Sequence, residues 1–247
     1  MVIEPNALET ARFGIACARV TDPSAPLDEI NAAAAETGVR MLVVRLPSED
    51  LARVQRLEAD GFRLMDTLVY YGRTLADLPD PVPGPVPGDE TIRPGTPQDT
   101  EAVGAIAAAA FAGYGGHYHA DPRLSDDAAD AAYVDWAETC ARGGGAAATP
   151  MLLAETARGQ ALGFLSLRLG ETEPQAADIV LNAVHPEAQG QGIYGRLLDR
   201  GLALCRAAGQ ARVTVSTQLP NLPVQRAWVR RGFRLERSLY TLHKWFD

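Results

Sequence analysis

The sequence predicts a mixed α/β fold in which a central sheet with flanking helices follows a smaller strand–helix–strand unit. Three observations support this prediction. Strand-like and helix-like segments alternate between residues 91 and 245, a proline-rich segment precedes them, and a pattern near the N-terminus recurs near the C-terminus. We therefore expect a partial N-terminal unit at residues 1–76, a proline-rich linker at 77–90 and a larger domain at 91–247.

The elements of the larger domain follow from its caps and periodicity. A short strand at 91–94 precedes two helices, at 101–111 and 125–141, for which Asp99 and Ser125 are suitable N-caps. Glycines after the apolar stretches end the helices. The remaining predicted elements are strands at 151–155, 161–169 and 178–184, a helix at 192–208, a strand at 212–217, a helix ending at Arg231 and a strand at 233–245.

An internal repeat relates the two ends of the chain at a shift of 171 residues. The run Gly61-Phe62-Arg63-Leu64 then falls on Gly232-Phe233-Arg234-Leu235, and Leu68 falls on Leu239. Further identities are Gly38 with Gly209, Val44 with Val215 and Leu51 with Leu222. The N-terminal unit therefore resembles a copy of the last strand–helix–strand of the larger domain. So small a unit buries little surface, so we expect it not to fold alone.

Composition restricts the partners of the protein. The formal net charge is -8, which disfavours nucleic acid and anionic membranes. Three widely spaced cysteines and no recognisable signal peptide favour a cytoplasmic protein without disulfides or a metal site. Any anion site must be local and made of backbone N–H groups and a few arginines. The sequence leaves the oligomeric state open, with a homodimer as one alternative.

A glycine-containing loop is the strongest local signal. It runs from Val184 through Gly190 and Gly192 to Leu198, where a strand ends and a helix begins. Glycines there let the backbone turn tightly and approach a ligand, and the first N–H groups of the helix point at one spot. Such a spot binds a pyrophosphate, helped by the helix dipole. The N-terminal unit has no comparable loop, so we expect it to bind no nucleotide-like ligand of its own.

These residues resemble the acetyl-CoA loop of the GCN5-related N-acetyltransferase (GNAT) superfamily, whose pattern is Gln/Arg-x-x-Gly-x-Gly/Ala. Gln189 and Gly192 match, whereas Tyr194 stands where the family has a small residue. Asn221 followed by an apolar helix and Gly232-Phe233 resembles a second family signature, and Ile92-Arg93-Pro94 with Asp99 resembles the first strand. The resemblance covers about residues 91–245. A weaker one is to nucleotide-sugar acetyltransferases that modify 4-amino-4,6-dideoxyhexoses.

The resemblance implies a GNAT-like sheet, preceded by a partial GNAT-like half-domain, and a place for the donor. The fourth and fifth strands of the domain would part, and acetyl-pantetheine would lie between them. A backbone N–H near Ala183 or Val184 would then bind the thioester oxygen. The residues implied to hold acetyl-CoA, without a metal, are Ala183, Val184, Gln189, Gly190, Gln191, Gly192, Ile193, Tyr194 and Asn221.

The residues for proton transfer remain open. The family's usual acid, a tyrosine, is replaced by Trp228, whose indole donates hydrogen bonds but is no acid near neutral pH. Tyr194 and Tyr240 are the alternative acids. For the base we consider His117 and His119 in the connection between the first two helices, since histidine titrates near neutrality. Asp178 and Glu155 are alternative bases, His185 is interpreted as structural or adjacent to CoA, and His243 as a strand residue.

Taken together, the sequence predicts direct acetyl transfer from acetyl-CoA to the primary amine of a small molecule, such as an amino sugar or sugar nucleotide. Two alternatives stay open. One is acetylation of a protein N-terminus or an antibiotic amine. The other is a non-catalytic acyl-CoA sensor, which the presence of Trp228 would favour.

Overall fold

The computed structural model describes residues 1–78, 90–143, 149–170 and 175–246 and contains one ten-stranded mixed sheet flanked by helices. The fold class predicted from the sequence is confirmed. The proline-rich linker predicted at 77–90 lies almost entirely outside the described residues. Among the helices that are described, none is long and apolar enough to cross a membrane.

The first repeat unit supplies seven of the elements. These are β1 (Ile3–Pro5), α1 (Ala7–Phe13), β2 (Cys17–Val20), α2 (Leu27–Thr37), β3 (Met41–Pro47), α3 (Leu51–Ala59) and β4 (Arg63–Thr74). Side-chain and backbone caps define several of these helices. The Asn6 side chain accepts from the Glu9 N–H at the start of α1, and Gly38 closes α2 in the left-handed conformation.

The larger domain follows the predicted order of strand, two helices, three strands, helix, strand, helix and strand. Its elements are β5 (Glu90–Pro94), α4 (Thr100–Phe111), α5 (Asp126–Arg142), β6 (Met151–Thr156), β7 (Ala161–Leu169), β8 (Ala176–Val184), α6 (Ile193–Ala207), β9 (Arg212–Gln218), α7 (Leu222–Val229) and β10 (Arg234–Trp245). Alternate residues of β6 face opposite cores. Leu152 packs with α6, whereas Met151 and Leu153 pack with α4 and α5.

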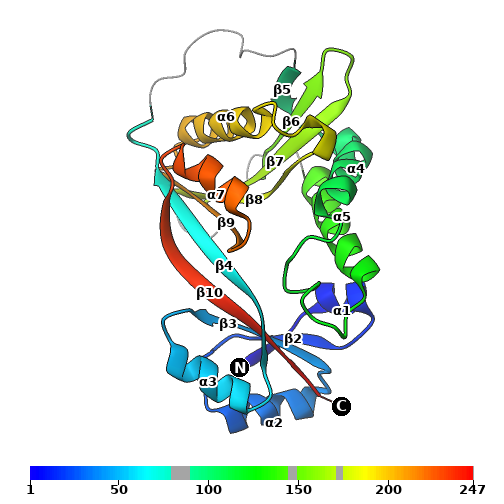
Figure 1. The fold of residues 1–247 in the computed structure, drawn as a ribbon, viewed down its shortest axis with the longest axis vertical. Helices are drawn as coiled ribbons and strands as arrows, with labels where there is room; N and C mark the ends of the chain where they lie inside the picture. Colours follow the sequence, from blue (N-terminus) through cyan, green and yellow to red (C-terminus); the bar gives the residue numbers. More distant parts are fainter. Residues whose placement is uncertain (79–89, 144–148, 171–174, 247) are drawn as a thin grey trace.

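The two repeats share the sheet by exchanging their last strands. The strand order is β1-β2-β3-β10-β4-β9-β8-β7-β6-β5, so β10 pairs with β3 of the first repeat and β4 pairs with β9 of the second. In Figure 1, β4 and β10 run side by side through the middle of the molecule and join its two ends.

The register of the exchanged strands repeats the shift of 171 residues found in the sequence. Leu239 lies opposite Pro47, and Leu68 lies opposite Gln218. The second pair is the first with each residue replaced by its counterpart in the other repeat. Leu68 and Leu239 also lie opposite each other, so the relation is a local pseudo-twofold centred on this pair. The structure therefore confirms the repeat as a structural one.

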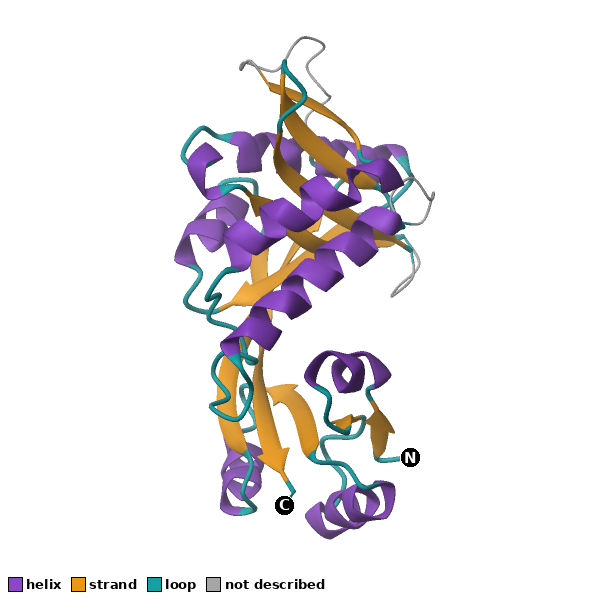
Figure 2. Ribbon diagram, turned by 90° about the vertical axis from the view of Figure 1, so that its right-hand side faces the viewer, coloured by secondary structure: helices purple, strands orange, loops and turns teal. Residues whose placement is uncertain are grey.

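The exchange places part of β10 in the core of the N-terminal unit. Leu242 has no exposed surface and packs in the same cluster as Val44, Leu57 and Phe62. The N-terminal strands form the lower end of the sheet in Figure 1, and in Figure 2 the helices α4 and α5 lie in front of its upper part. The C-terminal strand consequently carries its side chains into both halves of the molecule.

Candidate active site

The site begins where β8 and β9 stop pairing. The parallel ladder between them joins residues 176–179 to 212–215 and ends at the pair Ile179 and Val215. Beyond it, β8 continues to Val184 against β7, while Ser216, Thr217 and Gln218 pair with β4. The expected parting of the two strands is therefore confirmed, and it leaves a wedge of unpaired backbone between them.

The glycine loop lies at the mouth of this wedge. Gly190 and Gly192 adopt positive φ angles of 77° and 80°, and Gly192 is the N-cap of α6. Within the described residues, the backbone N–H groups from Gly190 to Gly195 donate no hydrogen bond to the protein. Gln189 fixes the other side of the loop, because its Nε2 donates to the Val184 carbonyl at 3.2 Å. The loop therefore offers free donors at a helix N-terminus, as an anion site requires.

One cavity of about 1320 Å³ joins the wedge, the loop and the N-terminal unit. Of the residues that the sequence predicts for cofactor binding, those that line it are Ala183, Val184, Gln189, Gly190, Gly192, Ile193, Tyr194 and Asn221; Gln191 is not among the lining residues. Its described lining includes six arginines and one carboxylate, that of Glu9. A chain with a net charge of -8 thus presents a locally cationic cavity.

The side chains of Tyr194 and Trp228 form a hydrogen-bonded pair in this cavity. The indole Nε1 of Trp228 donates to the Tyr194 hydroxyl at 2.7 Å, and both residues line the cavity. Trp228 is almost fully buried and packs against Tyr71. Burial raises the pKa of Tyr194, although the Trp228 N–H opposes this, so the phenol is protonated at neutral pH. Tyr194 therefore supplies the cavity with a hydroxyl group, which the indole of Trp228 lacks.

Asn221 belongs to a polar network on the opposite wall. Its Nδ2 donates to Thr217 Oγ1 at 3.0 Å and to the Tyr114 hydroxyl at 3.3 Å. Tyr114 and Thr217 are themselves 3.0 Å apart, oxygen to oxygen. The network ties the end of β9 to the segment that follows α4.

His117 is the histidine that the fold brings to the cavity. It is 5% exposed and lies after α4, where Gly116 permits a tight approach because an added Cβ would lie 2.6 Å from the Tyr133 hydroxyl. Its Nε2 is 3.4 Å from Nη2 of Arg45, and its Nδ1 is 2.9 Å from Nε2 of His243. Burial, Arg45 and His243 together hold the pKa of His117 well below its usual value, so the imidazole is neutral at neutral pH.

The other predicted proton-transfer residues lie outside the cavity lining. His119 is turned away and its Nε2 is 2.9 Å from Asp130. Asp178 lies in the paired part of β8 and accepts from the Thr214 hydroxyl. Tyr240 packs on the core of the N-terminal unit. His185 accepts from the Glu187 N–H at 3.4 Å, next to the loop.

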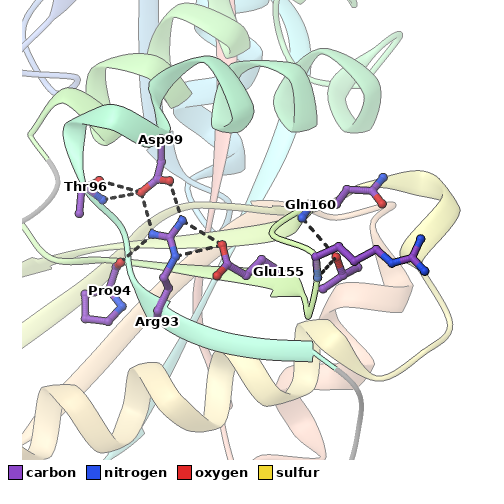
Figure 3. Close-up of polar contacts among 8 residues, drawn as sticks. Arg93, Pro94, Thr96, Asp99, Glu155 and Gln160 are labelled. Atoms are coloured by element: carbon purple, nitrogen blue, oxygen red, sulfur yellow. Dashed lines mark hydrogen bonds and ion pairs between the residues drawn. The ribbon is translucent and has the colours of Figure 1, made fainter.

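Glu155 has a structural partner instead. Figure 3 shows Arg93 of β5 between Glu155 and Asp99, and its guanidinium donates to both carboxylates at 2.8–3.0 Å. Asp99 also accepts from the Thr96 N–H. These bonds lower the pKa of Asp99 to about 2, Arg93 being the main cause. The cluster fastens the first turn before α4 to the edge of the sheet and takes no part in the cavity.

Several lining residues were not anticipated from the sequence. Arg45, Arg12, Arg19 and Glu9 come from the N-terminal unit, which reaches the cavity because the two units share one sheet. Arg12 pairs with Asp135 and Arg19 with Glu4. Arg45 lines the cavity next to His117. No spacing in the sequence marks these residues, since their proximity depends on the strand exchange.

Comparisons with known proteins agree with this geometry. Residues 115–233 match the model described as the acetyltransferase (GNAT) family. The spore coat polysaccharide biosynthesis protein SpsD of Bacillus subtilis is 28% identical over 209 residues, a match spanning 83% of this chain and 66% of that protein. The chain thus spans slightly under two thirds of the curated relative's length.

Solved structures resemble the fold over nearly the whole chain. A GCN5-related N-acetyltransferase from Sphaerobacter thermophilus has a TM-score of 0.65 at 16% sequence identity. The superposed region covers 98% of this chain and 76% of that protein's chain. A tandem GNAT protein from the clavulanic acid biosynthesis pathway has a TM-score of 0.60 at 18% identity, with 93% and 75% covered. The central part of the chain thus matches the acetyltransferase (GNAT) family model, and the fold of nearly the whole chain is similar to that of solved GNAT structures.

Proposed function

We propose that the protein transfers an acetyl group from acetyl-CoA directly to the primary amine of a small molecule, with an amino sugar or sugar nucleotide as the acceptor class. One observation carries this proposal. A single cavity extends from the free N–H groups at the start of α6, through the wedge between β8 and β9, to the neutral imidazole of His117. Donor, thioester and base therefore fit along one path.

The residues at the α6 end suit the pyrophosphate of coenzyme A. Free N–H groups from Gly190 to Gly195 and the arginines of the cavity supply hydrogen bonds and positive charge. When bound, acetyl-CoA supplies an activated acyl group. The His185 N–H bonds Leu162 of β7, so alternation along the strand turns the Val184 N–H toward the wedge. Of the two backbone donors considered from the sequence, Val184 is therefore the one aimed at a thioester oxygen.

His117 is suited to take the proton of the acceptor. An ammonium group must lose a proton before its nitrogen attacks the thioester carbon, and His117 offers a neutral imidazole in the cavity. As the new N–C bond forms, the C–S bond breaks and the thiolate leaves. The Tyr194 hydroxyl, held by Trp228, lies in the same cavity and can donate a proton to that sulfur. The nitrogen loses its second proton as the amide forms, and that proton restores the Tyr194 hydroxyl.

The acceptor class follows from the charges at the far end of the cavity. Arg45 brings positive charge from the N-terminal unit, and Arg12 and Arg19 line the same end, each paired with a carboxylate. An acceptor that carries phosphate groups would be attracted there, because guanidinium groups bind phosphate through paired N–H donors. The similarity to a polysaccharide biosynthesis protein agrees with a sugar acceptor.

The proposal is tested by following thiol release from acetyl-CoA with a panel of amines. Amino-sugar nucleotides and free amino sugars form one arm, and N-terminal peptides and aminoglycosides form another. Turnover that is fastest with amino-sugar nucleotides supports the proposal. Preference for peptides or aminoglycosides would replace the acceptor class, and coenzyme A binding without turnover on any amine would indicate an acyl-CoA sensor.

A further inference from the structure

The buried side chains of Asp121, His243 and His117 form a continuous hydrogen-bonded chain that ends at the cavity. His243 Nδ1 lies 2.7 Å from Asp121 Oδ2, and His243 Nε2 lies 2.9 Å from His117 Nδ1. The exposed fractions are 2% for Asp121, 0% for His243 and 5% for His117. Of the three, His117 alone is among the described residues that line the cavity.

The hydrogen-bonded chain joins two distant parts of the sequence. Asp121 and His117 lie between α4 and α5, whereas His243 lies on β10, the strand exchanged into the N-terminal unit. The Asp121 carboxylate is held further by the Trp245 indole N–H at 2.8 Å and the Arg123 N–H at 3.0 Å. Burial alone would raise the pKa of Asp121, but these bonds and the one from His243 keep it below its usual value. The carboxylate is therefore ionised at neutral pH and can only accept.

The partners at the two ends fix every proton along the chain. An ionised Asp121 accepts, so His243 Nδ1 carries a proton. At the other end Arg45 can only donate, so His117 Nε2 must accept. A neutral His117 then carries its one proton on Nδ1 and donates it to the bare Nε2 of His243. Both imidazoles are thus Nδ1–H tautomers, and the His117 Nε2 lone pair is directed toward Arg45, which also lines the cavity.

We infer that Asp121 and His243 are positioning residues that hold His117 in the base-competent tautomer and receive the positive charge created when the acceptor is deprotonated. This inference rests on the proposed function. The acceptor ammonium takes the place of Arg45 at His117 Nε2, where the contact with Arg45 Nη2 is a long one of 3.4 Å, and passes its proton to that nitrogen. The proton on His117 Nδ1 then passes to His243 Nε2. His117 becomes the neutral Nε2–H tautomer, and an imidazolium forms at His243 beside the Asp121 carboxylate. The proton returns along the same path as the site resets.

The groups around His117 disfavour a positive charge on its imidazole. The charged and titratable groups that face it are Arg45 from β3, His243 from β10 and Tyr118 beside it, with Glu9 of α1 bonded to the Tyr118 hydroxyl. A proton kept on a buried imidazole next to Arg45 would be strongly disfavoured. Moving the charge to His243 places it against the Asp121 carboxylate and away from Arg45.

The tautomers are tested directly by ¹⁵N NMR of histidine-labelled full-length protein at neutral pH. The chain has four histidines, so substitution of His119 and His185 assigns the spectrum. We expect His117 and His243 to show the Nδ1–H pattern, which is the minor tautomer of free histidine. An Nε2–H tautomer or an imidazolium at His117 would overturn the inference. This measurement is independent of any acetyltransferase activity.

The catalytic part is tested with Asp121→Asn, which keeps an acceptor of similar shape but removes the charge. We expect kcat to fall at least about tenfold, with the KM for acetyl-CoA unchanged. Loss of the carboxylate makes the imidazolium less stable, so the acidic limb of the kcat profile should move to lower pH. Asp60→Asn is the matched control, because it removes another carboxylate that is hydrogen-bonded to a β10 side chain, that of Lys244, but lies outside the cavity lining, so kcat should stay within about twofold.

The outcomes separate this inference from the proposed function. An unchanged kcat and an unchanged acidic limb in Asp121→Asn would overturn the relay even with the expected tautomers. If Asp121→Asn does not fold, the NMR tautomers of the wild-type protein decide. If the wild-type protein turns over no amine, the proposed function fails, and the relay as a catalytic device fails with it, whereas the proton positions are still decided by NMR.

Discussion

At the scale of single residues, the chemistry of this site depends on where a few atoms are held. Gly192 is needed for its backbone angle of 80°, which a side chain adopts at a cost of about 1–2 kcal/mol. Tyr194 matters for a hydroxyl that another residue orients. His117 matters for which of its nitrogens carries the proton. The backbone angle, the hydroxyl orientation and the proton position all depend on neighbouring residues, so the residue type alone does not reveal them.

Replacing Gly192 by valine should abolish coenzyme A binding in calorimetry while the circular dichroism spectrum stays native. The new Cβ strains the loop and lies 2.8 Å from Arg196, so the free N–H groups no longer point at one spot. Gly209→Val is the matched control, since Gly209 has a φ of 76° with open space around it at the far end of α6. Unchanged affinity in the Gly192 variant would remove the loop from the donor site.

Replacing Tyr194 by phenylalanine should lower kcat by about tenfold or more with little change in the KM for acetyl-CoA. The substitution removes the proton donor and leaves the Trp228 N–H without its acceptor, but it keeps the ring in place. Tyr240→Phe serves as a control, because Tyr240 packs on the N-terminal core outside the cavity lining. Steady-state kinetics that cannot distinguish the two variants would argue for an unassisted thiolate.

At the scale of elements, the exchange of β4 and β10 is the organising feature. Each strand completes the sheet of the other repeat, in the same register. Backbone groups of β3 are satisfied by β10, and Leu242 fills the core below. The unit formed by β1 to β4 therefore lacks its own central strand when it is separated from the rest of the chain.

We predict that residues 1–76 alone show no cooperative unfolding. Attaching residues 234–246 through a flexible linker should restore a cooperative transition, because the strand order β3-β10-β4 is then complete. Chemical denaturation followed by circular dichroism measures this. The same fusion with Leu242→Asp should stay unfolded, since it places a charge in the core. A stable 1–76 fragment would show that the exchange is not required for folding.

At the scale of the whole molecule, the two repeats contribute different parts of the cavity and of the core. The C-terminal repeat carries the glycine loop and the wedge, whereas the N-terminal unit contributes arginines to the far end of the cavity and a core for β10. The relay from Asp121 to His117 crosses this division through His243. The two ends of one cavity, proposed for donor and acceptor, are thus built by different halves of the chain.

The division predicts one coenzyme A per chain. In the N-terminal unit the segment before α2 contains no glycine, and Pro23 and Pro26 in it have no N–H groups, so it lacks the glycine turn and several of the donors found before α6. Titration calorimetry should give a stoichiometry near one that is lost in Gly192→Val. A stoichiometry of two would mean that the N-terminal unit holds a donor site of its own.

The sequence by itself determined the fold class and the repeat, and it predicted the glycine loop as the donor site. Glycines at a strand–helix junction and a constant shift of 171 residues are local or periodic signals, so they can be recognised along the chain. The tertiary structure alone decided that Arg45 and His243 meet His117, and that Trp228 orients Tyr194. These contacts join residues from 34 to 126 positions apart. Such contacts depend on strand exchange and helix packing, for which no spacing rule exists.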